Sequence, residues 1–257
     1  MLKKIICCLI FLIFLTTGCG KKQTEPEIIS DLDVIRDRNE LIVGVREDTK
    51  PFGYRDKDGN LQGIDIELAK EIAQYILDDK NKVKFVTVNA GNRIEKLNSK
   101  EVDILVATMT ITSQRLRVVD FSQAYYVAGQ ALMVRAKSDI TSLNQAVLYG
   151  PMIVVFGTTA EKALRDTYPA AKIIGAKTYQ EAYEMLKSGK GDGIVADDTI
   201  LMGFTGDKSV KLLPKRYSAE PYGVAMRQDA SSDDLKIAID ELIGNMATDG
   251  KLKKLYK

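Results

Sequence analysis

Residues 103–126, DILVATMTITSQRLRVVDFSQAYY, decide the fold that this sequence predicts. The run 104–107 is short and apolar and is followed by hydroxyls, which is typical of a strand buried on both faces of a parallel sheet. In open α/β sheets the binding crevice lies at the carboxyl ends of the strands. We therefore expect the next loop to present four polar side chains to a crevice, namely Thr108, Thr110, Thr112 and Arg115.

Arg115 and the neighbouring threonines have the chemistry of a carboxylate-binding site. A guanidinium is a planar fork of donors that matches a carboxylate, and hydroxyls with backbone amides can complete the shell. For an isolated TxTxxR pattern, a solvated loop with capping threonines is the simpler interpretation. On these residues alone both interpretations stand.

Strand and helix patterns alternate around this stretch. Residues 64–77 are predicted to be a helix because apolar residues recur at helical spacing, at Ile64, Leu68, Ile72 and Ile76. A helix at 93–98 and strands at 41–45 and 83–88 complete a βαβαβ order with the strand at 104–107. This order implies a parallel sheet with right-handed crossovers.

A second series of strands and helices begins after an apolar run at 131–134. It predicts strands at 153–155, 172–174 and 193–196, helices at 157–168 and 179–187, a strand near residue 224 and a long amphipathic helix at 233–248. The predicted fold class is α/β with two lobes, each a mostly parallel sheet flanked by helices. We expect crossings near residues 134 and 222, which assigns 31–133 and 223–257 to lobe 1 and 134–222 to lobe 2.

The amino terminus has the pattern of a bacterial export signal. Lys3 and Lys4 precede an apolar stretch at 5–15 and the sequence TTGC, which resembles a lipoprotein lipobox. A stretch of about 11 apolar residues is too short to span a bilayer, which requires ~20. We predict a signal peptide at 1–18, lipid on Cys19, a tether at 19–30, and an extracytoplasmic protein held at a membrane.

Composition excludes several classes of function. The chain has no histidine, which excludes Ser-His-Asp catalysis and histidine metal sites, and we expect no cofactor and no metal. Loss of Lys3 and Lys4 with the signal would reduce 37 basic residues to 35, equal to the 35 acidic ones. A neutral mature protein lacks the basic footprint of a nucleic-acid-binding protein. These features favour a binding protein, which we expect to be a monomer.

Several separated motifs together resemble a bacterial extracytoplasmic amino-acid-binding protein of an ABC importer. They are LIVGVREDTKPFGYRDKDGNLQGIDIELAKEIA, NRIEKLNSKEVDILVATMTITSQRLRVVDFSQAYY, VFGTTAE, GDGIVADDTIL and AEPYGVAM, and they cover nearly all of residues 30–257. The resemblance implies the two-lobed, type 2 periplasmic-binding-protein fold, which closes on a hinge over its ligand. It also implies two partners, a membrane permease and its ATPase.

The resemblance assigns roles around the ligand backbone. Arg115 and Thr110 match the residues that hold the α-carboxylate. The carbonyl of Thr108 and the carboxylate of Asp197 match the acceptors of the α-ammonium. Asp197 is also a plausible helix cap when it is considered without the resemblance.

Three further residues match ligand contacts of the family. Thr158 and Thr159 match the start of a helix in the second lobe, where free backbone amides attract carboxylates. Both are also good N-caps, and the two roles are compatible. Phe52 matches an aromatic residue that packs over the ligand.

Two more arginines bear on which amino acid is bound. Arg46 ends one predicted strand and Arg93 opens the helix after another, so both can point into the crevice that receives Arg115. This grouping resembles the members that bind glutamate or aspartate, whose side-chain carboxylate would pair with the additional cations. Without the resemblance, both arginines are equally compatible with surface positions.

Three alternatives remain open from the sequence. The ligand could be glutamine or another polar amino acid. The same fold resembles cyclohexadienyl dehydratases, so an enzyme is the alternative of a different class, although we expect no catalytic residue. A third interpretation, a receptor's sensor domain, would require a transmembrane helix after residue 233, and we predict none there.

Overall fold

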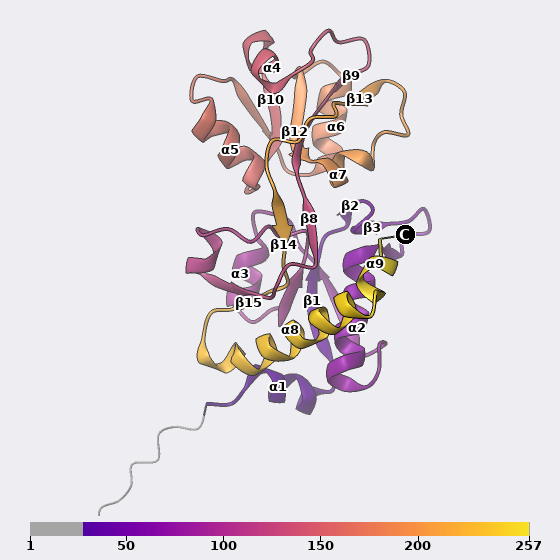
Figure 1. Cartoon of the computed structure of the whole chain (residues 1–257), viewed down its shortest axis with the longest axis vertical. Helices are drawn as coiled ribbons and strands as arrows, with labels where there is room; N and C mark the ends of the chain where they lie inside the picture. Colours follow the sequence, from indigo (N-terminus) through magenta and orange to yellow (C-terminus); the bar gives the residue numbers. More distant parts are fainter. Residues whose placement is uncertain (1–27, 257) are drawn as a thin grey trace, which may run out of the picture.

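Two sheets organise residues 28–256, which are the residues that the computed structural model describes (Figure 1). The first sheet has the order β5-β1-β6-β15-β7, with β1 parallel to both β5 and β6 and β15 antiparallel to its neighbours. Its strands are β1 (Leu41–Val45), β5 (Val83–Thr87), β6 (Ile104–Val106), β7 (Val119–Phe121) and β15 (Ala225–Arg227).

Helices cover both faces of the first sheet because each presents an apolar stripe to it. Leu68 and Ile72 of α2 are completely buried in one core, and Leu97 of α3 is completely buried in the core on the other face. The α-helices are α1 (Asp31–Arg38), α2 (Ile64–Leu77), α3 (Arg93–Asn98), α8 (Asp233–Thr248) and α9 (Lys251–Lys254), and the short 3₁₀ helices are η1 (Arg115–Arg117) and η2 (Ala230–Ser232). A small sheet of β2 (Asp48–Thr49), β3 (Gly53–Arg55) and β4 (Leu61–Gln62) adjoins them.

The second sheet has the order β11-β10-β12-β9-β13 and forms the other lobe. Strand β10 is parallel to β11 and β12, whereas β9 is antiparallel to β12 and β13. The strands are β9 (Gln130–Arg135), β10 (Met152–Val155), β11 (Ile173–Ala176), β12 (Gly193–Asp197) and β13 (Val210–Leu212). The helices are α4 (Leu143–Tyr149), α5 (Thr159–Thr167), α6 (Tyr179–Lys187) and α7 (Asp198–Met202).

Two strands run between the lobes and pair with each other, β8 (Tyr126–Ala128) and β14 (Glu220–Tyr222) (Figure 1). The crossing expected near residue 222 therefore coincides with β14. The crossing expected near residue 134 is wrong, because every residue of β9 pairs within the second sheet. The lobe boundaries at 133/134 and 222/223 stay predictions.

Some sequence-based predictions concern residues outside the described range. The signal peptide at 1–18, the lipidation site Cys19 and most of the tether at 19–30 lie there. None of the helices between residues 28 and 256 combines the length and the apolar character needed to cross a membrane.

Candidate functional site

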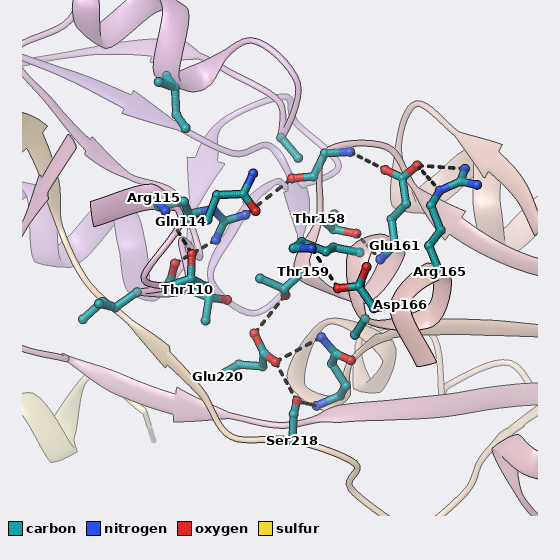
Figure 2. Close-up of a pocket in the computed structure, with 18 of the residues that line it drawn as sticks. Thr110, Gln114, Arg115, Thr158, Thr159, Glu161, Arg165, Asp166, Ser218 and Glu220 are labelled. Atoms are coloured by element: carbon teal, nitrogen blue, oxygen red, sulfur yellow. Dashed lines mark hydrogen bonds and ion pairs between the residues drawn. The ribbon is translucent and has the colours of Figure 1, made fainter. Parts of the chain in front are cut away.

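A small cavity lies where the two sheets face each other. It is lined by Arg46, Ala90, Arg93, Thr108, Thr110, Arg115, Thr158, Thr159, Tyr179 and Asp197. These residues follow the carboxyl ends of strands or begin helices, which is where α/β sheets bind ligands. The cavity therefore brings together eight of the nine ligand-binding residues predicted from the sequence. A larger cleft shares Thr110, Arg115, Thr158 and Thr159 with it (Figure 2).

Arg115 is held between the lobes by backbone carbonyls. Its Nη1 donates to the Thr110 carbonyl at 2.8 Å, and its Nη2 donates to the Gly157 carbonyl of the second lobe at 3.4 Å. Burial lowers the pKa of Arg115, an effect opposed by the charges of Asp197 and Glu220. The guanidinium thus keeps unused donor capacity beside the cavity.

Arg93 is the arginine of the site whose pKa is lowered most strongly. It opens α3 and is 3% exposed, and its Nη1 donates to the Ala107 carbonyl at 2.8 Å. Its Nε is buried and has no hydrogen-bond partner among residues 28–256. Burial, followed by the charges of Arg115 and Arg46, lowers the pKa of Arg93 well below its ordinary value. Within residues 28–256 Arg93 forms no salt bridge, so the cavity contains a desolvated cation without a direct counter-ion.

Arg46 lines the cavity, but a carboxylate of its own lobe already engages it. Its Nε and Nη2 donate to Oδ1 of Asp48 at 2.8 and 2.6 Å, and its Nη2 also reaches Oδ2 at 2.8 Å. The guanidinium lies over the ring of Tyr179 at 5.1 Å. Only Nη1 has no hydrogen bond within the described chain, so Arg46 has less to offer a ligand than the sequence suggested.

Thr108 has a backbone conformation that a buried carboxylate stabilises. Its φ of 44° is in the left-handed region, which is costly for a β-branched residue. The Thr108 N–H donates to Oδ2 of Asp65 at 3.0 Å, and the Tyr125 hydroxyl donates to Oδ1 at 2.8 Å. Burial raises the pKa of Asp65 to about 6, although both hydrogen bonds oppose the shift. Asp65 therefore fixes the loop that follows β6.

The threonines of the second lobe combine capping with lining of the cavity. Thr158 is the N-cap of α5, where its hydroxyl accepts the Glu161 N–H at 3.2 Å. The Thr159 hydroxyl donates to Glu220 on β14 at 2.9 Å (Figure 2). Thr158 thus both caps α5 and lines the cavity, whereas Thr159 lines the cavity as the first residue of the helix and is not its cap.

Asp197 ends β12 and faces the cavity from the second lobe. It is 6% exposed and accepts a hydrogen bond from the Tyr222 hydroxyl at 2.5 Å. Burial raises the pKa of Asp197 to about 7, while the Tyr222 hydrogen bond opposes the shift. A positively charged group in the cavity would favour the ionised carboxylate.

Phe52 does not line this cavity. It is 1% exposed and lies in the core of the first lobe, with its ring centroid 5.0 Å from that of Tyr126 and 5.4 Å from that of Tyr222. Its expected packing over a ligand is therefore replaced by packing against residues of the two crossing strands.

Four residues that shape the site were not predicted from the sequence, namely Asp48, Asp65, Tyr179 and Glu220. Their partners are remote in sequence, and Asp48 and Asp65 resemble ordinary loop and helix-start carboxylates. Of the four, only Asp48 had a local signal in the sequence, because its carboxylate lies two positions after Arg46. No group of three or more acidic or cysteine side chains within residues 28–256 is placed to hold a metal ion.

The two lobes with a charged cavity between them define the class of two-lobed solute-binding proteins. The sequence profile of the bacterial extracellular solute-binding proteins, family 3, matches residues 41–257, and the chain belongs to this family. The predicted resemblance to binding proteins of amino-acid ABC importers, with its type 2 periplasmic-binding fold, is confirmed.

Individual relatives differ in the ligands for which they are named. The chain is 35% identical to the ABC transporter glutamine-binding protein of Bacillus subtilis, over 96% of this chain and 93% of that protein. It is 27% identical to a glutamate-binding protein of Corynebacterium glutamicum, over 93% and 83%.

Two solved structures extend the comparison. The cysteine-binding protein from Campylobacter jejuni is 33% identical and superposes with a TM-score of 0.83, over 89% of this chain and 92% of that one. An ancestral amino-acid-binding protein described as a precursor of cyclohexadienyl dehydratase is also 33% identical, with a TM-score of 0.82 over 88% and 98%.

Proposed function

We propose that this protein captures an acidic amino acid, glutamate or aspartate, by closure of its lobes and delivers it to the permease of an ABC importer. The observation that supports the acidic side chain is Arg93. A desolvated guanidinium favours a negatively charged group beside it, and a neutral side chain would compensate its charge less well.

The ligand backbone would be held by groups of both lobes. The α-carboxylate pairs with Arg115 and the Thr110 loop. The α-ammonium is placed against Asp197 and the carbonyl of Thr108. The side-chain carboxylate then faces Arg93, and Nη1 of Arg46 supplies a second donor. In this arrangement every charge of the ligand meets an opposite charge in a site from which water is excluded.

Contacts between the lobes support closure as the capture step. The Arg115 guanidinium reaches the Gly157 carbonyl across the cleft at 3.4 Å. A Cβ at Gly157 would lie 2.9 Å from the Ala90 carbonyl of the first lobe, so glycine permits this approach. Closure around two paired strands, β8 and β14, is the hinge motion proposed here.

Glutamine is the second candidate ligand, and two observations favour it. Asp48 neutralises Arg46, which lowers the positive charge that the ligand must balance. The glutamine-binding protein of Bacillus subtilis is also more similar to this chain than the glutamate-binding protein of Corynebacterium glutamicum. A glutamine side chain would offer its amide oxygen to Arg93 as a neutral acceptor.

We propose a binding protein and not an enzyme. Asp197 is the acidic group closest in character to a general acid, but its place opposite an α-ammonium makes it a binding residue. Incubation with prephenate or arogenate, followed by chromatography of the products, tests this directly. Turnover of either compound would establish the dehydratase alternative instead.

We further propose that the mature protein is a monomer, that it begins at Cys19 and that lipid on this residue holds it outside the cytoplasm. The anchor would raise its effective concentration near the permease. Metabolic labelling with a palmitate analogue, compared between the native chain and Cys19→Ser, tests the anchor. Loss of label and release from membranes are expected for the variant.

A melting-temperature screen of the purified domain against the common amino acids tests the ligand. A ligand that binds only the folded state stabilises it by RT ln(1 + [L]/Kd), so a tight ligand at about 100 times its Kd adds about 2.7 kcal/mol. We expect the largest shifts with glutamate and aspartate. A larger shift with glutamine would select the second candidate, and no shift with any amino acid would reject the proposal.

A further inference from the structure

One carboxylate, that of Asp48, binds groups of both lobes at once. Its oxygens accept from Nε and Nη2 of Arg46 at 2.8 and 2.6 Å within the first lobe. Oδ2 also accepts the backbone N–H of Tyr179, in the second lobe, at 3.1 Å. Asp48 is not part of the cavity lining, so its contacts are with the protein and not with the space for a ligand.

The Tyr179 amide is a donor that its own helix cannot satisfy. Tyr179 is the first residue of α6, and the N-cap hydroxyl of Thr178 is already used by the Glu181 N–H at 3.1 Å. The first four amides of a helix lack intrahelical acceptors, and the partial positive charge there favours an anion. A carboxylate from the opposite lobe meets both requirements, and the resulting hydrogen bond is charge-assisted.

The side chain of Tyr179 strengthens the same junction. Its ring centroid is 5.1 Å from the Arg46 guanidinium carbon, which is within cation–π range. Arg46 is 1% exposed and Tyr179 is 6% exposed, so the ion pair of Arg46 and Asp48 is covered by the opposite lobe. Opening the lobes would expose both to water and break the Asp48–Tyr179 bond.

We propose that Asp48 is a positioning residue that latches the closed lobes and orients Arg46 with Nη1 towards the ligand. This inference rests on the ligand-driven closure proposed above. Because the latch forms only after the ligand has entered the open lobe, its loss accelerates ligand release and leaves association unchanged. Loss of one charge-assisted hydrogen bond corresponds to about a 10- to 100-fold faster release.

The test compares the wild type with Asp48→Ala and Asp48→Asn in the full mature domain. Calorimetry of the wild type first identifies glutamate, aspartate or glutamine as a ligand, and stopped-flow displacement then measures both rate constants. Glu47→Ala is the matched control, because Glu47 is adjacent but its side chain is 40% exposed and pairs with Arg55 on the surface. We expect faster release for Asp48→Ala, a smaller change for Asp48→Asn and no change for the control.

Hydrogen exchange of the Tyr179 amide gives a readout that a general loss of folding would not mimic. In the wild type we expect protection of this amide only with ligand bound, and in ligand-saturated Asp48→Ala we expect no protection. The Glu181 amide, which bonds within its own lobe, serves as the internal reference and stays protected in both. Failure of the wild type to bind glutamate, aspartate or glutamine would reject the proposed function. Normal binding with unchanged release rates, or equal Tyr179 protection with and without ligand, would reject the latch alone.

Discussion

Replacing Arg93 with methionine separates charge recognition from folding. Methionine is unbranched and fills a similar volume, so the substitution removes the guanidinium while leaving α3 packed. Arg93 is 3% exposed and its Nε has no partner within residues 28–256, so the closed form without a ligand bears the cost of a desolvated cation. Only the hydrogen bond to the Ala107 carbonyl is lost, at a cost of about 1 kcal/mol. We therefore expect the empty variant to melt at the same or a higher temperature.

The effect on binding should be large for an anionic side chain and small for a neutral one. Removing one partner of a buried ion pair costs about 3–5 kcal/mol, and each 1.4 kcal/mol is tenfold, so glutamate affinity should fall by about 10²- to 10⁴-fold. Glutamine bound to this variant would lose one hydrogen bond to the Arg93 guanidinium. The loss is partly offset because the variant has no unpaired charge at this position. Its affinity should change by about tenfold or less.

Isothermal titration with glutamate, aspartate and glutamine, at one pH and salt concentration, measures this difference. Lys96→Met is the control, because Lys96 is in the same helix and pairs with Glu101 on its outer face. Glutamate binding by Arg93→Met at wild-type affinity would refute the reasoning. An equal loss for glutamate and glutamine would also refute it, because it would assign Arg93 to the common part of the ligand.

Three further predictions concern the other charges of the site. Arg115→Ala should lower the affinity for every amino-acid ligand by about 10²-fold or more. Arg117→Ala is the control, because Arg117 is exposed and its loss should not change the affinity. Equal effects of the two substitutions would contradict the α-carboxylate role of Arg115. Burial raises the pKa of Asp197 to about 7, and this carboxyl must be ionised to hold an ammonium. Titrations at several pH values should therefore show ligand affinity falling by up to about tenfold per pH unit below 7. A flat profile of affinity between pH 5 and 8 would contradict this role. Asp65→Asn removes a buried negative charge close to the arginines, so the ratio of glutamate to glutamine affinity should rise. An unchanged ratio would mean that Asp65 acts only by holding the loop that follows β6.

Much of the fold could be predicted because its helices are long and periodic. The bounds predicted for α2, α3, α6 and α8 coincide with those in the structure. The direction of β9 could not be predicted in the same way, because a short apolar run has the same composition in a parallel and in an antiparallel position. As a result, the crossing near residue 134 was placed too late in the chain.

The candidate site was predictable where it depends on sheet geometry. Residues at the carboxyl ends of strands converge whatever the details of the loops, and this rule predicts that Arg46, Arg93 and Arg115 lie together. The place of Asp197, which is in the other lobe, was expected only from the family resemblance. Pairing between loops follows no such rule. Asp48 and Tyr179 are 131 residues apart, and no spacing in the sequence indicates that they meet. The pairing of Arg46 with Asp48 is different, because Asp48 lies only two positions away and its carboxylate was a local signal that the prediction did not use.

The balance of charges in the cavity narrows the question of ligand identity. Arg115 and Asp197 match the two charges common to all α-amino acids, so they cannot distinguish among them. Arg46 is offset by Asp48, which leaves Arg93 as the cation whose compensation depends on the ligand. Asp65 can compensate it only from a distance, and only when ionised, since burial raises its pKa to about 6. A bound carboxylate would compensate Arg93 at any pH at which the ligand is anionic, whereas with a bound amide the compensation would depend on Asp65 and would be lost as the pH falls below about 6. This direct pairing with Arg93 is the reason for which we propose an acidic ligand before glutamine.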